Sequence, residues 1–178
     1  MAPIFVTTWY LEMRARPPVR RAETPPGIVL TQLERPPVAE YRVLYDTVGR
    51  DYHWVDRRRI DDAELASLIH DPFVEIHAAR HAEGLVGYFE LDRATPGECK
   101  LAYFGLAPAW IGRGVGAWFL ERAVQRAWDG TTHRVTVHTC SLDHPRALAT
   151  YERAGFVRID EAYADFDPDP SAPRHDPA

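Results

Sequence analysis

The chain has 178 residues, of which 46% are hydrophobic and 26% are charged, as in an ordinary globular protein of one domain. Its formal net charge of -5 argues against nucleic acid as the main partner, because binding a phosphate backbone requires a basic face. No apolar run approaches the roughly 20 residues that span a bilayer, and the first residues lack the features of a secretory signal. The two cysteines, Cys99 and Cys140, lack the paired spacing of a metal site. We therefore expect a cytoplasmic protein with no metal, nucleic-acid or membrane partner.

The first part of the chain predicts two strands, a proline-rich connector and two helices. Residues 5–13 read as an extra edge strand, and residues 16–26 form the connector that follows it. Residues 27–33 predict a second, short strand. Apolar side chains at helical spacing predict a helix over residues 37–48, and acidic residues in a first turn predict another over residues 63–70.

The middle of the chain predicts an antiparallel meander, and the rest alternates helices with strands. Glycine-containing turns separate three strand-like runs, over residues 73–80, 85–92 and 98–106. The later elements are a helix over residues 118–128, a strand over 134–139, a helix over 145–154 and a strand over 156–159. Strands joined first by hairpins and then by helical crossovers predict an α+β fold, in which a mixed, mostly antiparallel sheet has helices on both faces.

These elements divide the chain into three parts. Residues 1–26 hold the extra strand and its connector, and residues 27–166 form the domain. The tail, residues 167–178, is rich in Asp and Pro, so we expect it to be disordered. Because the extra strand can complete a sheet within one chain or between two chains, the sequence is compatible with a monomer or a homodimer.

Three glycines, Gly112, Gly114 and Gly116, stand between a strand-like run and a helix-like run. Glycine lets backbone N–H groups turn toward a ligand, and a helix N-terminus behind the loop leaves further donors unpaired, so the loop predicts phosphate binding. A P-loop would need lysine followed by serine or threonine, and this loop has neither. A dinucleotide fingerprint would need G-x-G-x-x-G early in a βαβ unit, whereas this loop reads G-x-G-x-G and follows a meander.

Three segments together resemble the GNAT family of acetyl-CoA-dependent N-acetyltransferases: Leu106-Ala107-Pro108, residues 111–117, and Tyr151-Glu152-Arg153-Ala154-Gly155-Phe156. The family's loop, Gln/Arg-x-x-Gly-x-Gly/Ala, maps onto residues 111–116 with both glycines matching. Arg113 falls at the frequently basic position before the first of them, whereas Ile111 departs from the leading Gln or Arg. The resemblance spans residues 27–159 and is specific over residues 98–156.

The resemblance implies that acetyl-CoA is a co-substrate held mainly by backbone groups. The backbone of Phe104, Gly105 and Leu106 would pair with the pantetheine arm like an added strand. The N–H groups that would hold the pyrophosphate belong to Gly112, Arg113, Gly114, Val115, Gly116 and Ala117. His144 stands where the family often has Asn, and it would contact the cofactor or cap the last helix; Asp143 could cap the same helix.

The resemblance also implies a proton donor and leaves the base open. It puts the Tyr151 hydroxyl beside the cofactor sulfur, where a phenol with a pKa of about 10 can protonate a departing thiolate. The alternative for Tyr151 is a core aromatic. Three residues compete for the role of base. Some family members carry a glutamate where this chain has Lys100, and Glu98 lies on the same strand face two residues earlier. Others carry a glutamate on the next strand, close to His138 here, and Glu90 on the neighbouring strand is the third candidate. Each is also explained as an ordinary strand side chain.

The acceptor in this family lies between the first helical region and the later strands, which indicates Tyr45 and Trp54, with Tyr52 and His53 beside them. Such aromatics can hold an apolar or cationic group, although packing alone explains them equally well. We expect a small-molecule or peptide amine to attack the acetyl group directly.

A rival from another functional class is a catalytically silent acyl-CoA-binding or sensory module. Lys100, Ile111 and His144 each depart from the family pattern and favour this alternative. Turnover of an amine would distinguish the enzyme from the binding module.

Overall fold

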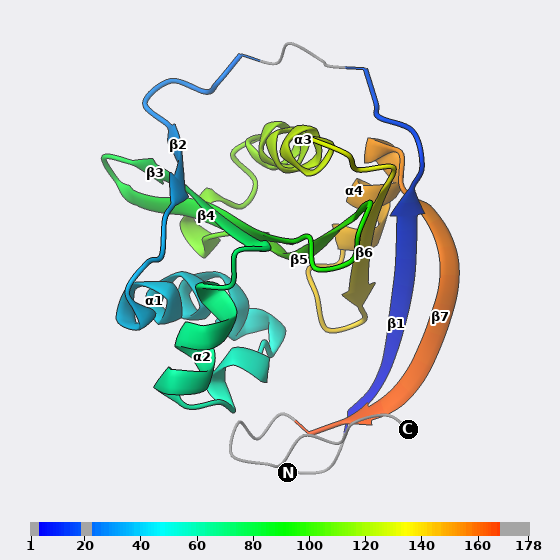
Figure 1. Ribbon diagram of the computed structural model, residues 1–178, viewed down its shortest axis with the longest axis horizontal. Helices are drawn as coiled ribbons and strands as arrows, with labels where there is room; N and C mark the ends of the chain where they lie inside the picture. The colour runs from blue at the N-terminus through cyan, green and yellow to red at the C-terminus, as the bar shows by residue number, and fades with distance from the viewer. Residues whose placement is uncertain (1–3, 19–22, 168–178) are drawn as a thin grey trace.

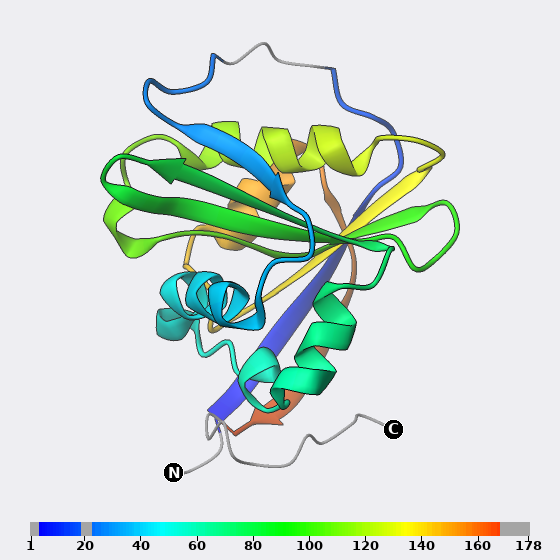
Figure 2. The same ribbon diagram turned by 60° about the vertical axis from the view of Figure 1, so that its left-hand side comes forward.

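The computed structural model describes residues 4–18 and 23–167, which form a seven-stranded sheet in the order β2-β3-β4-β5-β6-β1-β7. The strands are β1 (Ile4–Met13), β2 (Val29–Leu33), β3 (Val74–His81), β4 (Gly84–Asp92), β5 (Glu98–Leu106), β6 (Arg134–Cys140) and β7 (Val157–Phe166). The α-helices are α1 (Val38–Gly49), α2 (Asp62–Ile69), α3 (Gly116–Ala127) and α4 (Ala147–Ala154). Helices α1 and α2 cover one face of the sheet, and α3 and α4 cover the other (Figures 1 and 2). The predicted α+β fold is confirmed.

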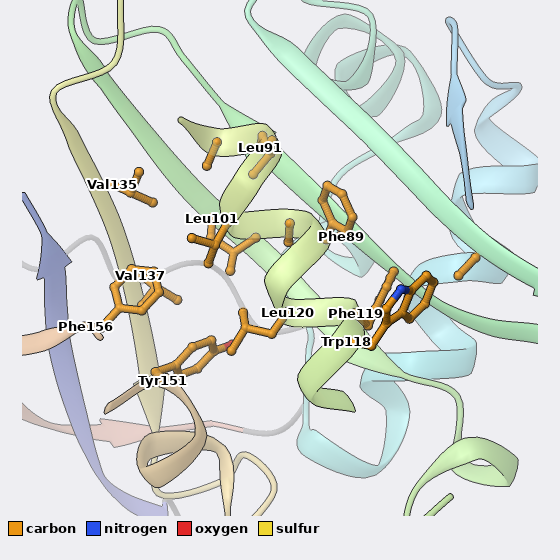
Figure 3. Close-up of a cluster of buried hydrophobic side chains, with 14 of the residues drawn as sticks. Phe89, Leu91, Leu101, Trp118, Phe119, Leu120, Val135, Val137, Tyr151 and Phe156 are labelled. Atoms are coloured by element: carbon orange, nitrogen blue, oxygen red, sulfur yellow. The ribbon is translucent and has the colours of Figure 1, made fainter. Parts of the chain in front are cut away.

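The sheet separates two hydrophobic cores because its strands alternate their side chains between the two faces. On the α3 and α4 face, Phe89, Leu101 and Val137 pack against Phe119 and Tyr151 (Figure 3). On the other face, side chains of α1 and α2 pack against those of β3 and β4; this core includes Tyr41, Leu44, Tyr45, Leu65, Ile76 and Tyr88. No helix in the described ranges is long and apolar enough to cross a bilayer.

The first strand, β1, lies inside the sheet, so its prediction as an edge strand is wrong. Thr8 to Met13 pair with β6, and Ile4 to Glu12 pair with β7, both antiparallel. The inward side chains Leu11 and Met13 are buried in the same core as α3 and α4. β1 therefore completes the sheet within this chain, and the segment separated as residues 1–26 contributes an interior strand, next to the edge strand β7.

The last strand is longer than predicted. β7 extends to Phe166 rather than ending at residue 159, because it pairs with β1 along almost its whole length. Of the predicted tail, only Asp167 is described, and its carbonyl accepts a hydrogen bond from Arg59 Nη2 at 2.7 Å. The expectation of disorder concerns residues 168–178, which lie outside the described residues.

An opening forms where the two parallel strands of the sheet, β5 and β6, diverge. Their register begins with Glu98 opposite Arg134 and ends with Leu101 opposite Val137. Ala102 follows as an extra residue on β5, since Leu91 of β4 faces Leu101 while Glu90 faces Tyr103. A bulge of this kind bends its strand and interrupts pairing. The second half of β5 consequently turns away from β6.

Candidate functional site

A cavity of about 930 Å³ occupies the opening between β5 and β6. Trp118 of α3 and Tyr151 of α4 line it on one face of the sheet, and Tyr45 of α1 and Trp54 line it on the other. The cavity therefore passes through the sheet, so two molecules can meet in it from opposite faces. No group of three or more His, Cys, Asp or Glu residues in the described part of the chain is placed to hold a metal ion.

The glycine loop lies at the α3 end of this cavity. Gly112 and Gly114 line it with φ angles of 81° and 80°, in the left-handed region that favours glycine. A Cβ built at either position meets nothing within 4 Å. These glycines are therefore required by the backbone conformation and leave the surface above them open to a ligand.

The N-terminus of α3 follows the loop without a side-chain cap. Phe119 is the first residue whose N–H reaches a helical acceptor, the carbonyl of Val115, at 2.9 Å. The N–H groups of Gly116, Ala117 and Trp118 therefore lack a helical acceptor, and the helix dipole adds a partial positive charge beside them. This arrangement suits an anion such as a phosphate.

Two side chains of the predicted phosphate loop turn away from the cavity. The Arg113 guanidinium pairs with Glu83 at 2.9 Å and lies 4.6 Å from the ring centroid of Trp110. The Val115 side chain is buried in the core. The prediction at both positions concerns the backbone N–H groups, and that of Arg113 donates to the Trp110 carbonyl at 3.4 Å. Ile111 does line the cavity, as an apolar group.

The second half of β5 offers an unpaired edge to the cavity. Phe104, Gly105 and Leu106 all line it, and they pair with β4 on their other side. The edge that faces β6 is beyond the last β5–β6 pair, so an extended ligand can add to it as a strand would. A Cβ on Gly105 would lie 2.4 Å from Val48 of α1, which explains why this position is glycine.

Tyr151 reaches the cavity from the core side. Its ring extends from α4 toward Leu120 of α3, and its centroid lies 6.2 Å from that of Phe104 (Figure 3). Burial and, next, the negative charge of Asp143 raise the pKa of Tyr151 well above its ordinary value. The hydroxyl therefore stays protonated at neutral pH and can donate a proton inside the cavity.

The loop before α4 differs in part from its prediction. His144 lines the cavity, and its Nδ1 accepts a hydrogen bond from the Arg146 N–H at 3.2 Å, at the start of α4. Asp143 does not cap this helix. Its carboxylate instead accepts hydrogen bonds from Thr139 Oγ1 at 2.7 Å and from the Cys140 N–H at 2.9 Å.

Two of the three candidate bases do not line the cavity. Glu98 precedes the opening and pairs with Arg134 at 2.9 Å, so its prediction as a catalytic residue is not supported. Glu90 is 1% exposed, and its carboxylate is held by Arg57 at 2.8 Å and by the Tyr41 hydroxyl at 2.6 Å. Both carboxylates are committed to partners inside the protein.

His138 is the candidate base that the structure brings to the cavity. It follows the last β5–β6 pair and points to the opposite face from Val137, toward the side of α1. Desolvation by the surrounding protein and, next, the positive charge of Lys100 lower the pKa of His138 below its ordinary value. A neutral imidazole near pH 7 can accept a proton.

Three aromatic rings form the α1 side of the cavity. The ring centroids of Tyr45, Trp54 and Tyr103 lie 5.2 to 5.5 Å from one another, and all three residues line the cavity. A Cβ on Gly49, at the end of α1, would lie 2.3 Å from the Trp54 indole, so glycine makes room for this ring. His53, just before it, has a φ of 56°, a strained value for a residue with a side chain.

Sequence reasoning missed the contribution of Tyr103 and the contacts of Asp143. Tyr103 reads as one of several aromatics in a strand, and the alternation along β5 that would assign its face is broken by Ala102. The contacts of Asp143 include a hydrogen bond from Trp54 Nε1 at 3.3 Å, across 89 residues of sequence. No local pattern could have indicated that contact.

The sequence matches known proteins over much of its length. Residues 39–156 match the Acetyltransferase (GNAT) family. The N-alpha-acetyltransferase RimI of Mycobacterium tuberculosis (strain ATCC 25618 / H37Rv) is 33% identical over 96 residues, which cover 54% of this chain and 58% of that protein. The chain thus spans less than two thirds of the length of this relative.

Solved structures show the same fold. A GCN5-related N-acetyltransferase from Sphaerobacter thermophilus has a TM-score of 0.66 at 18% identity, covering 91% of this chain and 51% of that one. A spermidine N-acetyltransferase from Vibrio cholerae, in complex with CoA and spermine, has a TM-score of 0.59 at 22% identity, covering 75% and 83%. At such identities the likeness concerns the fold alone.

The site fits acetyl-CoA, which the GNAT family uses. The amides at the start of α3 suit a pyrophosphate, and the free edge of β5 beyond Leu101 suits an extended arm. The cavity between these groups also contains the Tyr151 side chain. Since the family match covers well over half of the sequence and the geometry agrees with it, the chain belongs to the GNAT acetyltransferase family.

Proposed function

We propose that this chain transfers an acetyl group from acetyl-CoA to a primary amine within a ternary complex. The cavity that passes through the sheet carries this proposal, because it lets donor and acceptor approach from opposite faces. Acetyl-CoA supplies an activated acetyl group and a thiol leaving group. The nitrogen of the acceptor attacks the acetyl carbonyl directly, so no enzyme nucleophile is required.

The two proton transfers fall to residues on opposite faces of the sheet. His138, on the α1 side, accepts the proton that the amine loses, because an ammonium with a pKa of about 10 cannot attack a carbonyl. Tyr151, on the α4 side, donates its phenolic proton to the sulfur as the carbon–sulfur bond breaks. Backbone N–H groups of β5 polarise the carbonyl.

A combined binding and turnover assay tests this function. We expect acetyl-CoA to raise the melting temperature of the protein, and CoA thiol to be released when a panel of primary amines is added. Stabilisation without thiol release on any amine would instead support the acyl-CoA-binding module. If acetyl-CoA gave no stabilisation and no amine released thiol, both functions would be contradicted.

A further inference from the structure

The part of the cavity on the α1 side, which we call the acceptor chamber, is aromatic and acidic. Tyr45, Trp54 and Tyr103 form one wall, and a carboxylate oxygen of Asp143 accepts a hydrogen bond from Trp54 beside it. Asp56 also lines the cavity. Flat rings bind an apolar body by burying it, and their faces attract a cation. This wall therefore suits a molecule that is apolar at one end and positively charged at the other.

The arginines that line the cavity, within the described residues, lie away from this chamber. Among the described residues that line the cavity, the arginines are Arg146 and Arg153, both at α4 on the other face of the sheet. Arg57 lies over the ring of Tyr103, 5.3 Å from its centroid, and it is paired with the buried Glu90. A carboxylate on the acceptor would lie near the negative charge of Asp143, which would repel it.

Contacts across the chamber limit its size. The segment that carries Trp54 is joined to the loop before α4, where Tyr52 lies 6.2 Å from His144 between ring centroids. It also meets the end of β7, where His53 lies 6.3 Å from Phe166. The volume of about 930 Å³ must hold the acetyl-bearing arm as well. Only part of it is left for the acceptor, which favours a small molecule over a polypeptide.

We propose that the acceptor is a small primary amine with a flat apolar body and no carboxylate. This inference rests on the proposed acetyl transfer and specifies its acceptor. An amino acid is disfavoured by its carboxylate, and a peptide N-terminus by the chain that must continue out of the chamber.

Four amines that share one ring separate these features: phenethylamine, phenylalanine, phenylalanine amide, and a tetrapeptide amide that begins with phenylalanine. We expect kcat/KM for phenethylamine to exceed that for phenylalanine and for the tetrapeptide by at least about 100-fold. Trp54→Ala should raise KM for phenethylamine roughly tenfold while the Kd for acetyl-CoA is unchanged. Phe73→Ala, which removes an aromatic ring exposed outside the cavity, is the matched control.

The outcomes distinguish this inference from the proposed function. Preferred turnover of the tetrapeptide or of phenylalanine would overturn the inference and leave acetyl transfer intact. If none of the four amines were acetylated while another primary amine was, the inference would be overturned and the proposed function kept. If no primary amine were acetylated, the proposed function would be contradicted, and calorimetry with the four amines alone would decide the inference. Binding of phenethylamine that is tighter than that of phenylalanine and is weakened by Trp54→Ala would support it. Equal or absent binding would overturn it.

Discussion

The indole N–H of Trp54 donates a hydrogen bond to the carboxylate of Asp143 at 3.3 Å, and this contact crosses the cavity from the α1 side to the loop before α4. The other oxygen of Asp143 accepts hydrogen bonds from Thr139 and Cys140 at the end of β6. One acidic side chain thus holds both the Trp54 ring and the turn that leads to Tyr151. Its charge also helps to keep Tyr151 protonated.

A double-mutant cycle measures the Trp54–Asp143 contact. Trp54→Phe keeps an aromatic ring but removes the N–H, and Asp143→Ala removes the acceptor. We expect Asp143→Ala to cost about 1–3 kcal/mol of unfolding free energy, since it leaves the Thr139 and Cys140 groups unpaired. The coupling between the two changes should be about 0.5–1.5 kcal/mol in urea denaturation. Strictly additive effects would show that the indole contact contributes nothing.

Tyr151→Phe tests the proton donor. Removing the hydroxyl should lower kcat by about 100-fold or more, because general acid catalysis contributes that much to such a step. The Kd for acetyl-CoA should change less than about twofold, since the ring is retained. Tyr163→Phe removes an exposed hydroxyl on β7 and serves as the control in the same steady-state assay. Full activity of Tyr151→Phe would exclude the phenol as donor.

The pH dependence tests His138. A histidine base acts in its neutral form, so activity is lost as the pH falls through its pKa. Because the pKa of His138 is lowered, this acidic limb of the pH–activity profile should lie below about pH 6.5. Lys100→Gln removes a positive charge that lowers the pKa of His138, so the limb should move to higher pH. In the variant with His138→Gln, this acidic limb should be absent.

Two measurements check the prediction for His138: an NMR titration of its imidazole in the free protein, and the pH profile of kcat/KM for the amine. The variant with Lys100→Gln is compared with the unaltered protein in both. A pKa that does not move, or moves downward, would contradict the electrostatic argument. An acidic limb that persists in His138→Gln would assign the base elsewhere.

Glycine substitutions separate ligand binding from backbone strain. Gly112→Ala and Gly114→Ala put a Cβ at a φ near 80°, which costs about 1 kcal/mol of stability or more. Gly130→Ala does the same at a φ of 69°, in open space after α3 and outside the cavity. We expect similar melting temperatures for the three variants, but a tenfold or greater loss of acetyl-CoA affinity only in the first two. Equal affinities in all three would argue against the loop as the phosphate site.

Glu75 contributes stability that depends on pH. Its carboxylate joins β3 to α3 through Arg126 at 2.7 Å, and it also pairs with Arg93 at 2.8 Å. Burial alone would raise the pKa of Glu75, but hydrogen bonds from His77, Arg126 and Arg93 outweigh burial and lower it to about 2. Because the pKa of Glu75 is about 2 in the folded protein and 4.5 ordinarily, its ionised carboxylate stabilises the fold fully at pH values above 4.5. This stabilisation is lost as the pH falls from 4.5 toward 2.

Glu75→Gln should therefore cost roughly 3 kcal/mol at pH 7 and clearly less at pH 3. Urea denaturation at the two pH values measures both penalties. The same penalty at both would mean that the charge of Glu75 is not what stabilises this contact. Glu64→Gln, at an exposed position in the first turn of α2, is the control.

Hydrophobic periodicity and glycine positions correctly predicted the elements that depend on neighbouring residues in the sequence. The meander, the face of α3 and the loop before it follow from periodicity and from glycine, and all lie where the sequence placed them. The position of β1 could not be predicted, because its alternation shows which side chains are buried but not which strands it pairs with. Its partners begin more than 120 residues further along the chain.

The sequence left the choice among candidate bases open for a different physical reason. Glu98 and His138 both stand in strands with a polar face, and sequence alone cannot say where two strands stop pairing. The bulge at Ala102 and the last pair, Leu101 with Val137, decide that His138 reaches the cavity and Glu98 does not. The aromatic side of the cavity was predicted in part, since Tyr45 and Trp54 do line it.

The position of β1 between β6 and β7 has a consequence for the order in which the chain can fold. The residues of β1 find their partners only after β6 and β7, more than 120 residues further along, have emerged from the ribosome, and such distant pairings form slowly. Val6 and Thr8 of β1 and Phe166 of β7 also line the cavity. A nascent or truncated chain without β7 would therefore lack part of the cavity wall, however well its glycine loop had formed.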